Sequence, residues 1–217
     1  MRIVVVASGA LAPGDERQLE GADLVIAADG GADSLDRLGR RPDRLVGDLD
    51  SADPVLVGRL EAAGTRVDRH PIDKEASDTE LAVRAALDAG ADRIDLLGAT
   101  GGRRLDHELA NLLLLADPAL AGVELRAIVG GTSVRAARGG AGVALRGDPG
   151  DLVTLLPVGG DAHGVTTMGL RWPLEAATLR LGRSRGLSNV VVAAGASVRL
   201  ADGVLLVVET TSTGEPT

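Results

Sequence analysis

The sequence contains no cysteine, no phenylalanine and no tyrosine, and Trp172 is its only large aromatic residue. The lack of cysteine excludes disulfides, thiolate metal sites and cysteine nucleophiles. Three separated histidines do not form the ligand set of a zinc cluster. A formal net charge of −8 at pH 7 and the lack of rings for base stacking argue against a nucleic-acid partner.

Long apolar runs are lacking as well. The run Ile3–Ala7 is too short for a signal peptide or a membrane span, and it is typical of a buried strand. We therefore expect a cytoplasmic protein with no membrane partner. Apolar residues still make up 45% of the 217 residues, which is enough for a sizeable aliphatic core in one large domain or two small ones.

Strand-like and helix-like patterns alternate over residues 1–130. Such alternation predicts an α/β domain in which helices cover both faces of a mostly parallel sheet. Ligands of these domains gather at the carboxyl ends of the strands. The expected strands are Ile3–Ala7, Leu24–Ala28, Arg44–Val46, Thr65–Arg69, Ile94–Leu97 and Glu124–Val129, and the expected helices are Asp33–Leu38, Pro54–Ala63, Asp78–Ala89 and Asp106–Ala116.

The pattern changes after Gly130 and Gly131. Short β-type runs separated by Gly, Pro and Asp turns fill residues 131–217, and no long helical pattern remains. This predicts a second domain, an all-β sandwich or roll. Its expected strands are Thr132–Ala137, Gly142–Leu145, Leu152–Leu156, Ala177–Leu181, Val190–Ala194, Ser197–Leu200 and Gly203–Val208.

Two acidic motifs carry the strongest chemical signal. Asp48 and Asp50 follow an apolar strand, and on an extended chain residues two apart point the same way. Asp78 follows Ser77, which with Glu80 is typical of a capping box. Adjacent carboxylates need a cation between them, and oxygen ligands favour magnesium or calcium over zinc. Of these two ions, magnesium usually completes its ligand shell with water and substrate phosphates. The motifs therefore favour phosphoryl chemistry over the alternatives of a solvated turn and a helix-stabilising aspartate.

Two glycine-rich segments follow expected strands. Asp29-Gly30-Gly31 opens a helix, where glycines let a phosphate or nucleoside approach backbone N–H groups. Gly101-Gly102-Arg103-Arg104 adds two arginines, whose planar forks suit phosphate oxygens. Asp106 either caps the next helix or orients an arginine. Strand–Gly–Gly–helix junctions also occur for packing reasons alone.

A possible site for a flat ligand lies in the second domain. Trp172 stands between Arg171 and Pro173 in a turn-like setting, where its ring could stack on a heterocycle. Ser188 and Asn189 could bind the edge of such a ring. A core tryptophan and an ordinary turn are the alternatives.

Together these motifs resemble the thiamine pyrophosphokinase family, and they cover most of the chain in the order that the family has. They are Asp-Gly-Gly-Ala (29–32), Gly-Asp-Leu-Asp-Ser (47–51), Asp-Lys-Glu-Ala-Ser-Asp (73–78), Gly-Gly-Arg-Arg-Leu-Asp-His (101–107), Gly-Leu-Arg-Trp-Pro-Leu (169–174) and Gly-Leu-Ser-Asn (186–189).

The resemblance implies transfer of diphosphate from ATP to the hydroxyl of thiamine, with release of AMP. It implies a catalytic α/β domain at residues 1–130, a thiamine-binding β-sandwich at 131–217, and a homodimer with thiamine where the subunits meet. It assigns Mg²⁺ binding to Asp48, Asp50 and Asp78, catalysis to these three and Arg104, ATP binding to Asp29, Gly30, Gly31, Gly101, Gly102, Arg104 and Asp106, and thiamine binding to Trp172, Ser188 and Asn189.

Two departures from the family pattern matter. The chain has Arg103 and Arg104 where many members have one arginine, so the residue that contacts phosphate stays open, although Arg104 keeps the Arg-x-Asp spacing. Glu75 stands where aspartate is common. Two other functions remain to be weighed: diphosphate transfer to another hydroxymethyl heterocycle such as a pterin, and a non-catalytic module that binds nucleotide or thiamine.

Overall fold

The chain divides into two units, and the computed structural model describes residues 1–50 and 52–212 of it. Unit 1 comprises Met1–Leu114 and Gly122–Gly130. Unit 2 comprises Leu115–Ala121 and the chain from Gly131 onward. The segment Leu115–Ala121 therefore belongs to unit 2, although it precedes the expected domain boundary at residue 130.

Unit 1 is built on a parallel sheet, as the alternating patterns predict. Its strands lie in the order β4-β3-β2-β1-β5-β6, and every neighbouring pair is parallel. On β1, residues 3–6 are completely buried, as expected of a strand that is covered on both faces. The bounds are β1 Arg2–Val6, β2 Leu24–Ala28, β3 Arg44–Gly47, β4 Arg66–Arg69, β5 Arg93–Leu97 and β6 Glu124–Val129.

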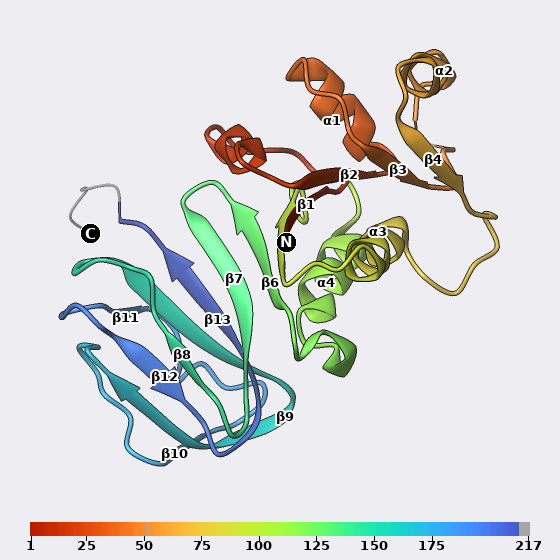
Figure 1. Cartoon of the computed structure of the whole chain (residues 1–217). Helices are drawn as coiled ribbons and strands as arrows, with labels where there is room; N and C mark the ends of the chain where they lie inside the picture. The colour runs from red at the N-terminus through yellow and green to blue at the C-terminus, as the bar shows by residue number, and fades with distance from the viewer. Residues whose placement is uncertain (51, 213–217) are drawn as a thin grey trace. The chain divides into compact units, whose positions relative to one another are not determined.

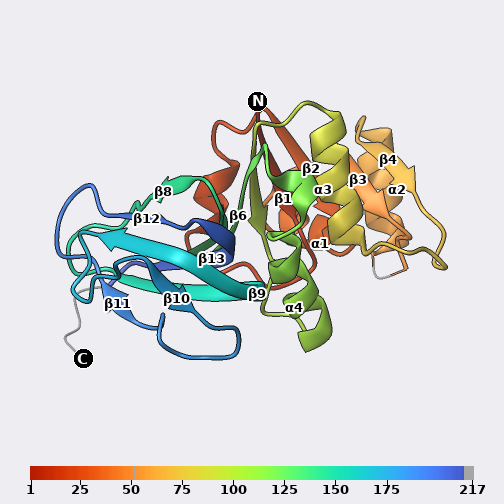
Figure 2. The same cartoon turned by 90° about the horizontal axis from the view of Figure 1, so that it is seen from below.

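Helices cover both faces of this sheet. Figure 1 shows α1 and α2 on one face and α3 and α4 on the other, and α3 packs across β1, β2 and β3 (Figure 2). The helices are α1 Gly31–Arg37, α2 Pro54–Ala62, α3 Asp78–Asp88 and α4 Leu105–Leu114, and short 3₁₀ helices span Asp15–Leu19 in this unit and Pro118–Leu120 in unit 2.

Polar side chains fix where two of these helices begin. The Asp53 carboxylate accepts a hydrogen bond from the Val55 N–H at 2.9 Å, and Pro54 takes the first position of α2. The Ser77 hydroxyl accepts one from the Glu80 N–H at 3.2 Å, as the predicted capping box requires. Helix α3 therefore starts at Asp78 for a reason that is local to the sequence.

The chain changes direction at the centre of the sheet. From β1 it moves outward to β4, and it then returns to place β5 on the other side of β1. In open α/β sheets such a reversal opens a crevice at the carboxyl ends of the strands, where ligands bind.

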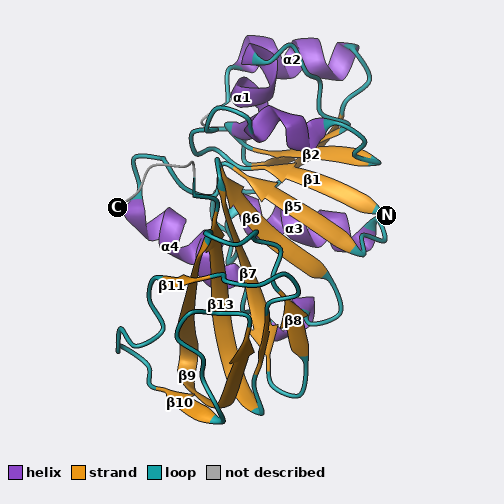
Figure 3. Ribbon diagram, turned by 90° about the vertical axis from the view of Figure 1, so that its left-hand side faces the viewer, coloured by secondary structure: helices purple, strands orange, loops and turns teal. Residues whose placement is uncertain are grey.

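Unit 2 is an antiparallel β domain with its own aliphatic core, in agreement with the predicted fold class. Figure 3 shows β7, β13 and β9 side by side, and their pairings are antiparallel. The buried core includes Val153, Val165, Leu179 and Leu205. The bounds are β7 Thr132–Arg138, β8 Gly142–Ala144, β9 Leu152–Met168, β10 Ala177–Leu179, β11 Asn189–Val190, β12 Ser197–Arg199 and β13 Asp202–Thr210.

Strand β9 differs most from the sequence-based expectation. The sequence predicts a strand that ends at Leu156, whereas β9 runs on to Met168. Its first half pairs with β13 and β11, and its second half pairs with β12 and β10. The glycine pair at 159–160 resembles a turn but acts as a bend within one strand, since Gly159 has a φ of 74° and a bend can be absorbed there without breaking the ladder.

No helix in the described part of the chain has the length and apolar character that spanning a membrane requires.

A buried carboxylate connects three strands of unit 1. Asp95 on β5 has no exposed surface and accepts a hydrogen bond from the Arg2 Nε of β1 at 2.7 Å and another from the Arg126 Nε of β6. Burial alone would raise the pKa of Asp95, but the hydrogen bonds from Arg126 and Arg2 outweigh burial and hold it below its usual value.

Replacing Asp95 with asparagine should destabilise unit 1, because the two partly buried guanidinium groups of Arg2 and Arg126 lose their buried counter-charge. We expect a loss of about 3–5 kcal/mol in the free energy of unfolding, measured with urea at pH 7. Since the folded pKa of Asp95 lies below the unfolded one, this contribution is present above about pH 4 and is lost as the pH falls through the folded value.

The matched control is Asp92→Asn. The Asp92 carboxylate pairs with the N-terminal ammonium but is 78% exposed, so its replacement should leave the urea midpoint unchanged. Equal urea midpoints for the two variants would show that the buried charge of Asp95 does not stabilise unit 1.

Candidate active site

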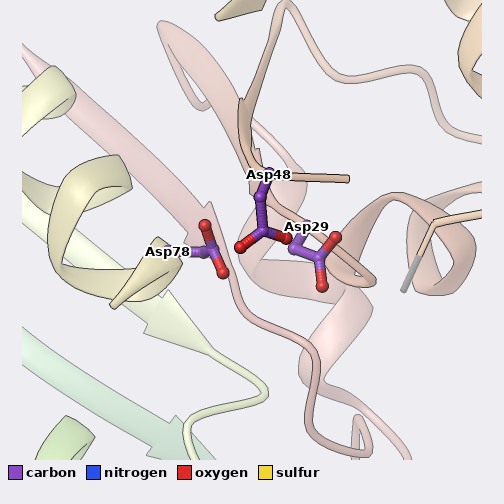
Figure 4. Close-up of side chains that lie close together, drawn as sticks. All are labelled: Asp29, Asp48 and Asp78. Carbon is purple, nitrogen blue, oxygen red and sulfur yellow. The ribbon is translucent and has the colours of Figure 1, made fainter. Parts of the chain in front are cut away.

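Three carboxylates from separate parts of unit 1 converge at the carboxyl edge of the sheet (Figure 4). Asp29 follows β2, Asp48 follows β3, and Asp78 is the first residue of α3. One oxygen of each lies within 4.8 Å of one oxygen of each of the others. Three such groups repel one another unless a cation shares them, so their arrangement can hold a metal ion.

Gly47 lets the end of β3 approach the other two aspartates. Its φ of 152° lies in a region that side chains rarely adopt. A Cβ at this position would lie 3.0 Å from the Asp78 Oδ1 and 3.2 Å from the Asp29 Cβ. Glycine at this position therefore allows the backbone of β3 to come close to both aspartates.

The backbone around Asp29 is fixed at both sides. Its N–H donates to the Val46 carbonyl at 2.9 Å and its carbonyl accepts from the Ala32 N–H at 3.0 Å. Asp29 itself has a φ of 45° and is 6% exposed. Strands β2 and β3 and the start of α1 therefore determine where this carboxylate lies.

Lys74 supplies a positive charge to the carboxylate cluster formed by Asp29, Asp48 and Asp78. Its Nζ contacts the Asp48 Oδ2 and lies 2.9 Å from the Asp78 Oδ1. The hydrogen bond from Lys74 lowers the pKa of Asp48. Burial alone would lower the pKa of Lys74, but its hydrogen bonds to Asp48 and Asp78 outweigh burial and raise that pKa above its usual value. The charges of Asp48 and Lys74 are therefore both present at neutral pH.

Asp50 lines the same cavity but is not one of the three clustered carboxylates. Leu49 has a left-handed φ of 63°, so the chain turns there and the alternation of an extended strand does not apply. The Asp50 N–H donates to the Asp48 Oδ1 at 3.2 Å, which closes a local turn. The metal-binding role of Asp50 stays a prediction, whereas Asp29, predicted to bind ATP and not the metal, belongs to the carboxylate cluster.

The carboxylate cluster opens into a cavity of about 330 Å³ at the point where the chain reverses. Loops after β1, β2, β3 and β5 and the first turns of α3 and α4 form its wall. The lining residues are Ser8, Gly9, Asp29, Asp48, Asp50, Ser77, Asp78, Thr79, Gly98, Ala99, Gly102, Arg103, Arg104, His107, Glu108 and Asn111.

Both candidate arginines line this cavity. Arg104 forms a two-pronged ion pair with Asp106, in which its Nε donates to the Asp106 Oδ1 at 3.0 Å. The pair is exposed, and Arg104 lowers the pKa of Asp106 to about 2. Asp106 therefore pairs with an arginine, as one of its predicted roles requires. Its part in ATP binding and the choice between Arg103 and Arg104 as the phosphate ligand stay predictions.

Packing explains some of the glycines that the motifs include. Gly31 lies so close to β1 that a Cβ would come within 2.0 Å of the Val6 carbonyl oxygen. Gly30 caps α1 and Gly101 has a φ of 82°. Their roles in ATP binding, like that of Gly102, stay predictions.

Sequence reasoning missed Ser8, Gly9 and Lys74. Gly9 must be glycine, because a Cβ would lie 2.2 Å from the Thr100 carbonyl oxygen. The signal for Ser8 and Gly9 was their place directly after the first strand, where the strand-end rule already pointed. Lys74 belongs to the motif Asp-Lys-Glu-Ala-Ser-Asp (73–78). It lies four residues before Asp78, but α3 begins only at Asp78, so helical spacing did not predict a contact between the two side chains.

In unit 2, the side chain of Asn189 holds the backbone of Trp172. Its Oδ1 accepts from the Trp172 N–H at 3.1 Å and its Nδ2 donates to the Trp172 carbonyl at 2.7 Å. The indole is 56% exposed, and the Arg171 Cζ lies 5.7 Å from its ring centre. Trp172 is thus not a core residue. Ser188, which has a φ of 55°, directly precedes Asn189 in the chain.

Two family models match the chain in sequence. The model for the thiamin pyrophosphokinase catalytic domain matches residues 16–126, and the model for the thiamin pyrophosphokinase vitamin B1 binding domain matches residues 143–205. The chain belongs to the thiamin pyrophosphokinase family. The predicted family and its activity, ATP-dependent formation of thiamine diphosphate, are thereby confirmed.

Individual relatives agree with this assignment. The thiamine pyrophosphokinase of Bacillus subtilis is 27% identical over 87% of each chain. Its crystal structure superposes with a TM-score of 0.86 at 26% identity, covering 98% of this chain and 100% of the other. The Geobacillus thermodenitrificans thiamin pyrophosphokinase superposes with a TM-score of 0.81 at 28% identity and covers 99% of both chains.

Replacing Gly47 with alanine should weaken the site without unfolding the protein. The new Cβ would push on Asp78 and Asp29, so we expect the affinity for Mn²⁺ to fall by about tenfold, equivalent to about 1.4 kcal/mol. The measurement is a calorimetric titration of the purified protein, with circular dichroism to confirm the fold.

Gly58→Ala is the control, since Gly58 lies within α2 and a Cβ there meets no atom within 4 Å. That variant should keep the metal affinity and gain about 0.5–1 kcal/mol of stability. Unchanged Mn²⁺ binding in Gly47→Ala would show that the close approach of β3 is not needed.

Proposed function

We propose that this family member performs the transfer with the cavity of unit 1, where Asp29, Asp48 and Asp78 converge. The hydroxyl oxygen of thiamine bonds to the β-phosphorus of ATP, and the bond from that phosphorus to the oxygen of the α-phosphate breaks, so AMP leaves. The convergence of the three carboxylates beside two arginines is the observation that carries the proposal.

The carboxylate cluster fits Mg²⁺. Its donors are all oxygen, which Mg²⁺ prefers, and an ammonium group already lies between two of them in the place of a cation. Asp29, Asp48 and Asp78 would hold the ion, with Asp50 as a further candidate. When bound, Mg²⁺ neutralises and aligns the phosphates of ATP.

The remaining tasks fall to side chains of the cavity wall. Arg103 or Arg104 binds phosphate oxygens, and Arg104 pairs with Asp106, which holds its guanidinium at the cavity. Asp50 and Asp78 are the two candidates for accepting the proton of the thiamine hydroxyl. Positioning and charge neutralisation supply most of the catalysis in phosphoryl transfer.

Thiamine binding is the proposed task of unit 2. Trp172 presents a flat exposed ring whose backbone Asn189 holds in place, and such a ring stacks on an aminopyrimidine. Ser188 would bind the edge of the heterocycle. The match to the vitamin B1 binding domain favours thiamine over a pterin.

We further propose a homodimer with thiamine bound where two subunits meet. Unit 2 exposes several large apolar side chains, including Met168 at 61% and Leu181 at 53%. A second copy that covers such side chains removes apolar surface from water. Sedimentation velocity at micromolar concentration should give the mass of two chains.

The activity assay combines the protein with ATP, Mg²⁺ and thiamine and follows AMP and thiamine diphosphate by chromatography. Equal amounts of both products support the proposal. Turnover only with a hydroxymethylpterin would instead support the rival transferase, and binding of both ligands without AMP would support a non-catalytic module.

Asp48→Asn should lower kcat by about 10²–10³-fold, because the neutral amide no longer holds the cation that stabilises the transferred phosphates. Asp36→Asn is the control, since Asp36 pairs with Arg59 on the exposed surface of unit 1. Near-normal turnover of Asp48→Asn would remove Asp48 from the proposed site.

Trp172→Ala should weaken thiamine binding by about 1–3 kcal/mol, the range for stacking of a base on an aromatic ring. Calorimetry with thiamine measures the change, and Val55→Ala, at an exposed apolar position of α2, provides the control. If the affinity for thiamine stays the same while stability falls, Trp172 has only a structural role.

A further inference from the structure

Lys74 is the only lysine in the chain, and the other basic residues that bring the total to 23 are all arginines. Its side chain is 12% exposed, and its ammonium contacts Asp48 and Asp78, which come from different elements. A compact ammonium with three donors can lie between two carboxylates, whereas the planar fork of arginine needs more room. The chain thus keeps its single lysine at the carboxylate cluster.

The ammonium offsets a repulsion that the fold creates. Three carboxylate oxygens lie within 4.8 Å of one another, and Lys74 forms ion pairs with two of the three groups. Without a cation, Asp48 and Asp78 would repel each other across a partly buried gap. Lys74 therefore keeps the ligands close together while no metal ion is bound.

The same contacts place Lys74 in competition with a divalent cation. Mg²⁺ binds carboxylate oxygens at about 2.1 Å, and an ammonium hydrogen-bonded to the same groups would then be held at close range to a like charge. Two cations that bind Asp48 and Asp78 repel each other, so each weakens the binding of the other to these carboxylates.

Resting on the proposed function, we propose that Lys74 is a positioning residue that acts as an exchangeable counter-ion. It holds Asp48 and Asp78 in place before the divalent cation binds, and it gives up its contacts with them when the cation arrives. The site is thereby assembled in advance, at the expense of affinity for the free ion.

The first test is a calorimetric titration of Lys74→Met with Mn²⁺ alone. Loss of the competing charge should tighten Mn²⁺ binding by about tenfold relative to the unaltered protein. In EDTA the variant should melt at a lower temperature, because the carboxylates then lack any cation, and saturating Mn²⁺ should raise its melting temperature by more than that of the unaltered protein.

Arg84→Met is the matched control. It also removes one positive charge from the region of α3, but the Arg84 guanidinium pairs with Glu80 at 2.5 Å and contacts no carboxylate of the cluster in the described structure. Its Mn²⁺ affinity should stay within about twofold of the unaltered protein. Unchanged or weaker Mn²⁺ binding in Lys74→Met would overturn the proposal.

The second test needs no variant. Because the chain has one lysine, protein labelled with ¹³C at the lysine Cε gives a single side-chain NMR signal of that kind. Titration with Mg²⁺ alone should move this signal with the same midpoint as the heat of binding. A signal that stays fixed while Mg²⁺ binds overturns the exchange, even if Lys74→Met fails to fold.

Neither test uses ATP or thiamine. A protein that forms no thiamine diphosphate can still show the exchange, and an active enzyme can still fail to show it. The fate of the proposed function and the fate of this inference are therefore measured separately.

Discussion

The mutual repulsion of three carboxylates is the constraint on which the rest of unit 1 depends. Asp29 and Asp48 sit at the ends of neighbouring parallel strands, and Asp78 sits at the capped start of α3. Each position is set by backbone hydrogen bonds and aliphatic packing, so the sheet supplies the free energy that brings like charges together. Clustered carboxylates attract cations, and the metal ion of a metal–polyphosphate complex is such a cation.

The two units present different chemical groups on their surfaces. Unit 1 offers charge: acids at the strand ends and exposed arginines across the cavity. Unit 2 offers a flat ring on an antiparallel scaffold whose interior is aliphatic. The scarcity of aromatic residues makes this contrast sharper, because the single indole lies at the surface and not in a core.

Much of this could be predicted from the sequence, because strand order and helix starts follow from local patterns such as the aliphatic run of β1 and the cap at Ser77. The position of Asp50 could not be predicted, because it depends on the left-handed backbone conformation of Leu49. Glycine is the usual sequence signal for that conformation, and this position has a leucine. The length of β9 could not either, because a glycine pair within a long bent strand looks the same as one in a turn. Contacts of Lys74 arise only when the loop folds back onto β3.

Arg171 lies over one face of the Trp172 indole, and Asn189 clamps the backbone beneath it. A ligand that stacks on this ring therefore meets an indole with one face already covered by a guanidinium. Such a ligand gains contact on the opposite face only. The position of Arg171 thus determines which face of the indole is open for stacking.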